Sequence, residues 1–171
     1  MFIRTERLFL RPGWPEDMQD LRDLANEGGV VCSTSAVELD AYLSRPRDVL
    51  LPHLFINLRG DNGSRLIGGV GLSRSGDEVE LGYWLARKYR GHGYAAEALQ
   101  AVLAEARMLG HRRIIAKHVA DGEAPARVLE QSGFKLASAG RAADARVRLY
   151  VANLTDKLFN LLGVGPNPAR A

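Results

Sequence analysis

Residues 78–110, EVELGYWLARKYRGHGYAAEALQAVLAEARMLG, constrain the fold more than any other stretch, because they predict a strand, a glycine-rich turn and a helix in direct succession. Apolar residues alternate with other types from Glu78 to Leu85, which is the period-two pattern of a strand buried on at least one face. From Tyr94 to Leu109 the apolar residues recur on one helical face, and Gly110 stands where helices commonly end. A glycine-containing turn therefore joins the end of the strand to the start of the helix.

That turn predicts an anion site. Gly91 and Gly93 carry no Cβ, so they can adopt positive φ and let a ligand approach the main chain. The first amides of the following helix have no intrahelical partner and lie at the positive end of the helix dipole, which suits a phosphate. Cationic side chains stand beside it, at Arg87, Lys88 and Arg90. A short glycine motif has a second explanation, an ordinary helix start with a flexible loop, and only its context can decide.

The rest of the chain predicts one mixed α/β (α+β) domain over residues 1–171, with residues 163–171 as a frayed tail. Three consecutive strands read as antiparallel neighbours, whereas the long connection through the helix at 94–109 indicates a parallel crossover. The expected strands are Thr5–Arg11, Leu50–Leu58, Leu66–Leu72, Glu78–Leu85, Arg113–Ala120, a strand from Phe134 and Val147–Asn153. The further helices expected are residues 15–28, 35–43, 125–132 and a last one after Thr155-Asp156.

Composition narrows the function classes. At 46% hydrophobic residues with no apolar run of membrane-spanning length and no signal sequence, the chain is expected to be cytoplasmic. Its one cysteine, Cys32, fits a reducing compartment, and its four histidines lack metal-ligand spacing, so no metal is expected. The net charge of +3 agrees with an anionic ligand, but the basic residues are too dispersed to indicate nucleic acid, and no membrane partner is expected.

Four motifs in order, TERLFLRP, LIGGVGL, VELGYWLARKYRGHGYAAEAL and RVLEQSGFKL, resemble the GNAT superfamily of N-acetyltransferases and its RimJ/RimL-like branch, over residues 5–153. The family's acetyl-coenzyme A signature, Gln/Arg-x-x-Gly-x-Gly/Ala, falls on Lys88–Gly93, where Lys replaces the first residue. The resemblance implies a GNAT-like domain with a largely antiparallel sheet, helices on both faces and a splayed parallel strand pair. It also implies acetyl-CoA as cosubstrate and an amine as acceptor.

The resemblance implies a set of binding residues as well. The pyrophosphate of acetyl-CoA would lie on the main chain of Arg90, Gly91, His92, Gly93, Tyr94 and Ala95. The pantetheine arm would bond to the main chain of Trp84, Leu85 and Ala86, where the strand at 78–85 diverges from the strand at 113–120.

Besides Lys88, four positions depart from the family pattern. Gly122 and Pro125 replace an Asn and a Ser that relatives place near the pantetheine and the thiol. Leu129 stands where relatives place a tyrosine general acid, and Lys117 where they place a glutamate base. A thiol pKa of about 8.5 makes the leaving group tolerant of a missing acid. The acceptor is the stricter requirement, since deprotonating a lysine at pH 7 costs roughly 3 kcal/mol more than deprotonating an N-terminal amine.

An acetyltransferase without a strong base is expected to act on protein N-termini, of the ribosomal-protein type. Glu80 is the best candidate base, directly or through water, and His118 is the next. Each also has a non-catalytic explanation, which for Glu80 is a solvated strand carboxylate or an ion pair with a nearby arginine. Small-molecule amines such as polyamines or aminoglycosides, and a non-catalytic acyl-CoA-binding role, stay open. A dinucleotide oxidoreductase fits less well, because Asp121 lies about 30 rather than about 20 positions beyond Gly91. The oligomeric state, monomer or homodimer, is open.

Overall fold

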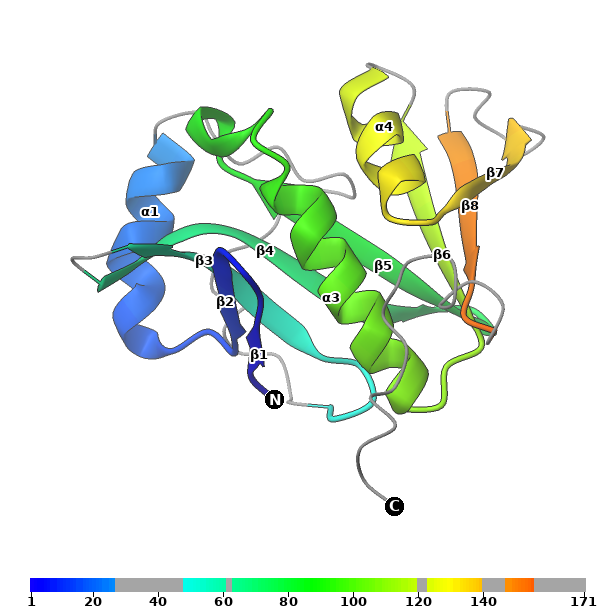
Figure 1. The fold of residues 1–171 in the computed structure, drawn as a ribbon, viewed down its shortest axis with the longest axis horizontal. Coiled ribbons are helices and arrows are strands. Elements are labelled where there is room, and N and C mark those ends of the chain that lie inside the picture. The colour runs from blue at the N-terminus through cyan, green and yellow to red at the C-terminus, as the bar shows by residue number, and fades with distance from the viewer. Residues whose placement is uncertain (27–47, 61–62, 120–122, 140–146, 156–171) are drawn as a thin grey trace.

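The computed structural model describes residues 1–26, 48–60, 63–119, 123–139 and 147–155. In these ranges eight strands form one sheet in the order β1-β2-β3-β4-β5-β6-β8-β7 (Figure 1). The strands are β1 Ile3–Arg4, β2 Leu8–Arg11, β3 His53–Gly60, β4 Gly63–Ser75, β5 Glu78–Leu85, β6 Arg113–Val119, β7 Lys135–Ala139 and β8 Val147–Asn153. The helices are α1 Met18–Asn26, α3 Tyr94–Met108 and α4 Glu123–Gln131, with short 3-10 turns at η1 Pro15–Asp17 and η2 Arg87–Tyr89.

One strand pair departs from regular pairing. Every other neighbouring pair in the sheet is antiparallel, but β5 and β6 run parallel and pair through Glu80 and Ile115 alone. Beyond that pair the two strands diverge like a V, which is plain between the labels β5 and β6 in Figure 1. The predicted splay is therefore confirmed, and it opens towards the end of β5 that leads into α3.

The sheet separates two apolar layers. On one face α3 and α4 cover a large core that includes Leu81, Leu99 and Ile114, all close to fully buried. On the other face α1 contributes Leu21 and Leu24 to a smaller cluster, with Phe55 and Trp84 from the sheet among its other members. The domain is thus a sheet with helices on both faces, as expected, and β5 presents Leu81 and Leu85 to the larger core and Trp84 to the smaller cluster.

Several boundaries differ from the sequence-based expectations, among them β3, which runs over His53–Gly60 rather than Leu50–Leu58. The first predicted strand, Thr5–Arg11, is shorter in the structure, where only Leu8–Arg11 form β2. Residues 5–7 form the turn of a hairpin with β1, in which the Leu8 amide donates to Thr5 Oγ1 and the Thr5 amide donates to the Leu8 carbonyl. Strand β4 is longer than expected at both ends, and α4 begins at Glu123 rather than near Pro125. In contrast β5 and β8 have the predicted bounds, and α3 ends one residue early, with Gly110 at a positive φ of 92°.

Several predictions fall outside the described residues. These include the helix at 35–43, the last helix, Cys32, Asp121 and Gly122. Within the described ranges there is no helix long and apolar enough to cross a membrane, and no group of three or more His, Cys, Asp or Glu placed to hold a metal ion.

Candidate active site

The loop before α3 carries backbone amides that have no hydrogen-bond acceptor among the described residues. Gly91 and Gly93 have φ values of 77° and 80°, so both adopt the left-handed conformation that favours glycine. Gly93 is the N-cap of α3 and makes no side-chain cap, while residues 91–93 are exposed. Across the described part of the chain no acceptor bonds to the amides of residues 91–96, and the first helical bond starts from Glu97 N to Gly93 O. The loop is therefore free to bind an anion through its main chain.

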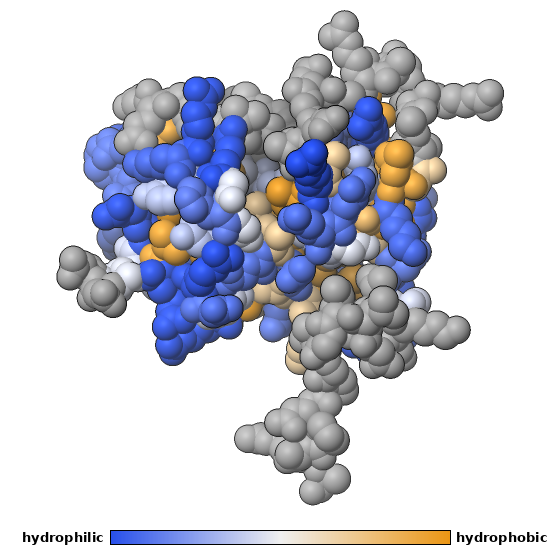
Figure 2. Space-filling model, turned by 45° about the horizontal axis from the view of Figure 1, so that its top comes forward, coloured by the Kyte–Doolittle hydropathy of each residue, from blue (hydrophilic) through white to orange (hydrophobic). Residues whose placement is uncertain are grey.

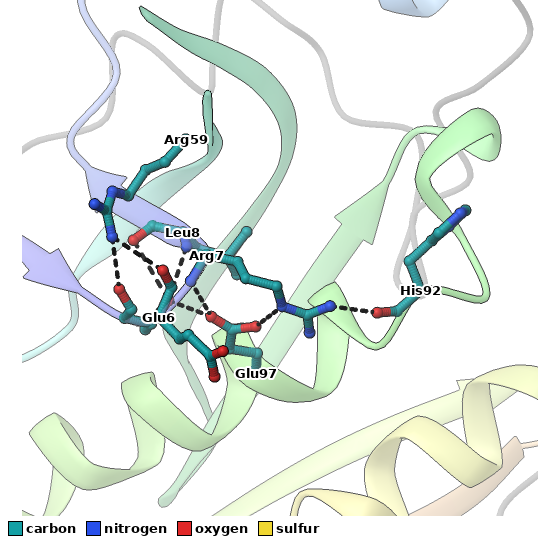
Figure 3. A network of polar contacts seen from close by, with 7 residues as sticks. Glu6, Arg7, Leu8, Arg59, His92 and Glu97 are labelled. Atoms are coloured by element: carbon teal, nitrogen blue, oxygen red, sulfur yellow. Dashed lines mark hydrogen bonds and ion pairs between the residues drawn. The ribbon is translucent and has the colours of Figure 1, made fainter. Parts of the chain in front are cut away.

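A network around Arg7 holds this loop (Figure 3). Arg7 Nε donates to Glu97 Oε2 at 2.7 Å, and Arg7 Nη1 donates to the His92 carbonyl at 2.9 Å. Glu97 Oε1 accepts from the Arg7 amide and from the Thr5 hydroxyl. The guanidinium also lies over the Tyr94 ring, 4.6 Å from its centroid. The turn between β1 and β2 is thus tied to the first turn of α3 and to the glycine loop.

The charge of Glu97 depends on this network. Burial raises the pKa of Glu97, but hydrogen bonds from Thr5 and Arg7 and the positive charge of Arg7 outweigh it, so the net pKa is lowered. Glu97 is therefore ionised at neutral pH and neutralised by Arg7. Without Arg7 a carboxylate would stand in the first turn of α3 beside an anion site.

The end of β5 is fastened to the same loop. Arg90 Nε donates to the Leu85 carbonyl at 3.0 Å. Both backbone groups of Ala86 are engaged, the amide with Ile67 O at 2.9 Å and the carbonyl with Tyr89 N at 2.9 Å. The other two residues expected to bond a pantetheine arm, Trp84 and Leu85, pair with Gly69 and Gly68 of β4.

Tyr83 and Trp84 lie on opposite faces of β5. Trp84 is buried in the cluster with α1, whereas Tyr83 packs against the core under α3. Burial raises the pKa of Tyr83 to about 12, although the positive charge of Arg90 opposes the shift. The Tyr83 hydroxyl therefore keeps its proton throughout the physiological pH range.

The two predicted bases lie on different faces of the sheet. Glu80, which forms the one pair between β5 and β6 in the described structure, lies on the face of Trp84, and its Oε2 is 2.8 Å from Lys117 Nζ. Lys117 Nζ also donates to Ser75 Oγ at 2.7 Å. His118, the neighbour of Lys117 along β6, faces the other side and is 6% exposed. The structural reading of Glu80 as an ion-pair partner is correct, with Lys117 rather than an arginine as the partner.

Leu129 is a core residue, 2% exposed among the apolar side chains under α4. The side chain of Pro125 and all of Gly122 lie outside the described residues.

Arg7 and Glu97 are site residues that sequence reasoning missed. They stand 90 positions apart, so neither predicts the other, although both fall inside motifs that carry the resemblance.

Taken together, the site combines an exposed row of amides with an open strand pair. Figure 2, which brings the diverging end of the molecule forward, shows apolar residues between polar flanks. Such an arrangement can hold a phosphorylated ligand at the loop and direct a less polar arm along β5.

Comparison with known proteins gives one family match. The model of a family described as "Acetyltransferase (GNAT) domain" matches residues 7–135. No curated protein matches the chain.

Solved structures share the fold. An acetyltransferase from Agrobacterium tumefaciens str. C58 is 25% identical, covering 90% of this chain and 94% of that one, with a TM-score of 0.68. A Vibrio cholerae protein provisionally named as a ribosomal-protein-serine acetyltransferase is 17% identical, covering 90% and 97%, with a TM-score of 0.69. Microcin C7 self immunity acetyltransferase MccE, solved with acetyl-CoA and AMP, is 15% identical, covering 87% and 93%, with a TM-score of 0.66. At these last two identities the likeness concerns the fold alone.

Proposed function

The chain belongs to the GNAT acetyltransferase family, and from that premise we propose that its acceptor is the α-amino group of a protein N-terminus. The family assignment makes the chain an acetyltransferase that depends on acetyl-CoA. The RimJ/RimL-like branch and the ribosomal-protein acceptor belong to the proposal.

Acetyl-CoA would bind first through its diphosphate. The amides of Gly91, His92, Gly93, Tyr94 and Ala95, together with Arg90, are proposed to hold it. This is supported by the absence of competing acceptors in the described chain and by the two left-handed glycines. The pantetheine arm would then follow β5, bonding to the main chain of Trp84 and Leu85 and passing Ala86. A thioester on that arm would reach the gap that opens after Glu80.

The acceptor proposal rests on the state of Glu80. Its carboxylate is bonded to Lys117 Nζ at 2.8 Å, so the acidic group at the gap is engaged by a cation of the protein. A site with a weak base favours an amine that is partly neutral at pH 7, and an α-amino group with a pKa of about 8 meets that condition far better than a lysine. Glu80, acting through water, and His118 stay predictions for proton transfer.

The acceptor is tested by thiol release from acetyl-CoA against three amine classes. The first class is a set of lysine-free peptides with free N-termini. The second class is the same set of peptides with the N-terminus acetylated and one internal residue replaced by lysine. Polyamines and aminoglycosides form the third. We expect turnover with free N-termini and a value of kcat/KM at least tenfold lower for the others. Turnover confined to the small amines would refute the N-terminal acceptor while leaving the acetyltransferase assignment intact.

A further inference from the structure

The imidazole of His53 leans across the sheet on the face opposite α3. His53 opens β3, and its neighbour on β4 is Gly71. A Cβ placed on Gly71 would come within 3.0 Å of His53 Cγ and Cε1, and closer still to Nδ1. The Nδ1 edge of the ring therefore occupies the space that a side chain at position 71 would fill. The ring is half-buried there, over the neighbouring strand rather than over its own.

His53, Gly71 and Gly82 lie side by side across β3, β4 and β5, and this line of residues ends at the gap between β5 and β6. Gly71 pairs with His53 on one side and with Gly82 on the other. Gly82 follows Glu80 by two residues, so it is the first position on this face beyond the Glu80–Ile115 pair. It carries no side chain, and neighbouring strands lie about 5 Å apart, so a ring over β4 stands about 5 Å from the β5 backbone at the gap. The ring therefore lies one strand spacing from the β5 edge of the gap.

This face is the one from which an acceptor would approach. His53 lies two residues before Phe55 on β3, and Phe55 and Trp84 pack with α1. The amides that would hold the diphosphate begin α3, on the opposite face. A thioester reaching the gap from the α3 side would thus present its carbonyl carbon to groups on the His53 side.

We propose that His53 is the general base of the acetyl transfer, an inference that rests on the proposed function of the same site. The amine lone pair bonds to the thioester carbonyl carbon, and the amine proton passes to an imidazole nitrogen of His53. The C–S bond then breaks, its electron pair leaves with sulfur as a thiolate, and the imidazolium returns its proton to the thiolate or to solvent.

An imidazole suits this step better than the carboxylate beside it. Histidine has an unperturbed pKa of about 6.5, close to neutral pH, whereas a carboxylate near 4 is a weaker base for an ammonium group. Glu80 is also bonded to Lys117, which leaves it a role in ordering the gap. A glycine is required at position 71 because a Cβ there would clash with the His53 ring.

The test is the pH dependence of kcat for the full chain, measured by thiol release with whichever amine the wild type turns over. We compare the wild type, His53→Ala, Gly71→Ala and the double variant, each checked by thermal melting. His53→Ala should lower kcat about 100-fold, keep KM for acetyl-CoA within about twofold, lose the acid limb of the profile and regain activity with added imidazole. Gly71→Ala displaces the His53 ring and should lower kcat by a similar factor. In the His53→Ala background, where there is no ring to displace, Gly71→Ala should lower kcat little further.

Two results would overturn the assignment. One is an acid limb that persists in His53→Ala. The other is a Gly71→Ala loss of equal size in both backgrounds, which would mean that Gly71 acts independently of the ring. Because the acceptor is whichever amine the wild type uses, failure of the N-terminal proposal shows separately, as a preference for another amine class.

Discussion

Replacing Arg7 by alanine should weaken acetyl-CoA binding, although Arg7 lies outside the glycine loop. The substitution removes the bond from Nη1 to the His92 carbonyl and the bond from Nε to Glu97. It also leaves the Glu97 carboxylate without its counter-charge in the first turn of α3. Both changes act on the amides that are proposed to hold the diphosphate.

The size of the effect follows from the contacts. A hydrogen bond to a charged group contributes about 1.5–3 kcal/mol when buried, but an exposed ion pair only about 0.2–1 kcal/mol. The Arg7 side chain is 42% exposed and that of Glu97 17%, which places this pair between the two cases. A loss of about 1–2 kcal/mol in holding the loop corresponds to a rise in Kd of about 5- to 30-fold.

Isothermal titration with acetyl-CoA measures this, with Arg22→Ala as the control, because Arg22 is an exposed arginine on α1 and its loss changes net charge equally. In a Glu97→Gln background the Arg7→Ala effect should shrink, since no uncompensated carboxylate remains. If a folded Arg7→Ala variant bound acetyl-CoA as the wild type does, Arg7 would have no part in arranging the loop.

Three further perturbations test separate parts of the site. Gly91→Val and Gly93→Val should abolish acetyl-CoA binding, whereas Gly110→Val, at a similar positive φ of 92° with no atom nearby, should lose stability and still bind in the same titration. Tyr83 keeps its proton when folded up to a pKa of about 12 but loses it near 10 when unfolded, so rising pH favours unfolding. Between pH 10 and 12 the wild type should therefore lose up to about 2 kcal/mol of unfolding free energy relative to Tyr83→Phe, measured by urea denaturation. Glu80→Gln should lower kcat about tenfold or less with KM for acetyl-CoA unchanged, and equal kcat values would remove Glu80 from the mechanism.

The parts of the fold that sequence predicts well are those set by local pattern. Strand β5 and helix α3 follow directly from alternation and helical periodicity, and the end of α3 follows from Gly110. The splay of β5 from β6 is different, because no local pattern encodes it. It was expected only through the resemblance, and the structure places it at Glu80 and Ile115.

Long-range side-chain contacts were beyond local reasoning. Arg7 meets Glu97 across 90 positions, and Lys117 meets Glu80 across 37. Charged residues of this kind are ordinarily exposed, and a sequence does not say which opposite charge each will find. The first prediction of a continuous strand at Thr5–Arg11 failed for the same reason, since the turn there is held partly by contacts with α3.

The LIGGVGL segment shows how one strand can serve both faces of the sheet. Gly68 faces the α3 side, where a Cβ would meet the Trp84 carbonyl at 2.5 Å and Leu85 Cδ1 at 2.9 Å, so a side chain there would displace the end of β5. Gly71 faces the α1 side, where a Cβ would displace His53. Because successive strand residues point to opposite faces, the two glycines act on different sides of the same gap. Gly68→Ala should therefore impair acetyl-CoA binding, whereas Gly71→Ala should impair turnover, and this division separates the two functions of a motif that sequence alone presents as one.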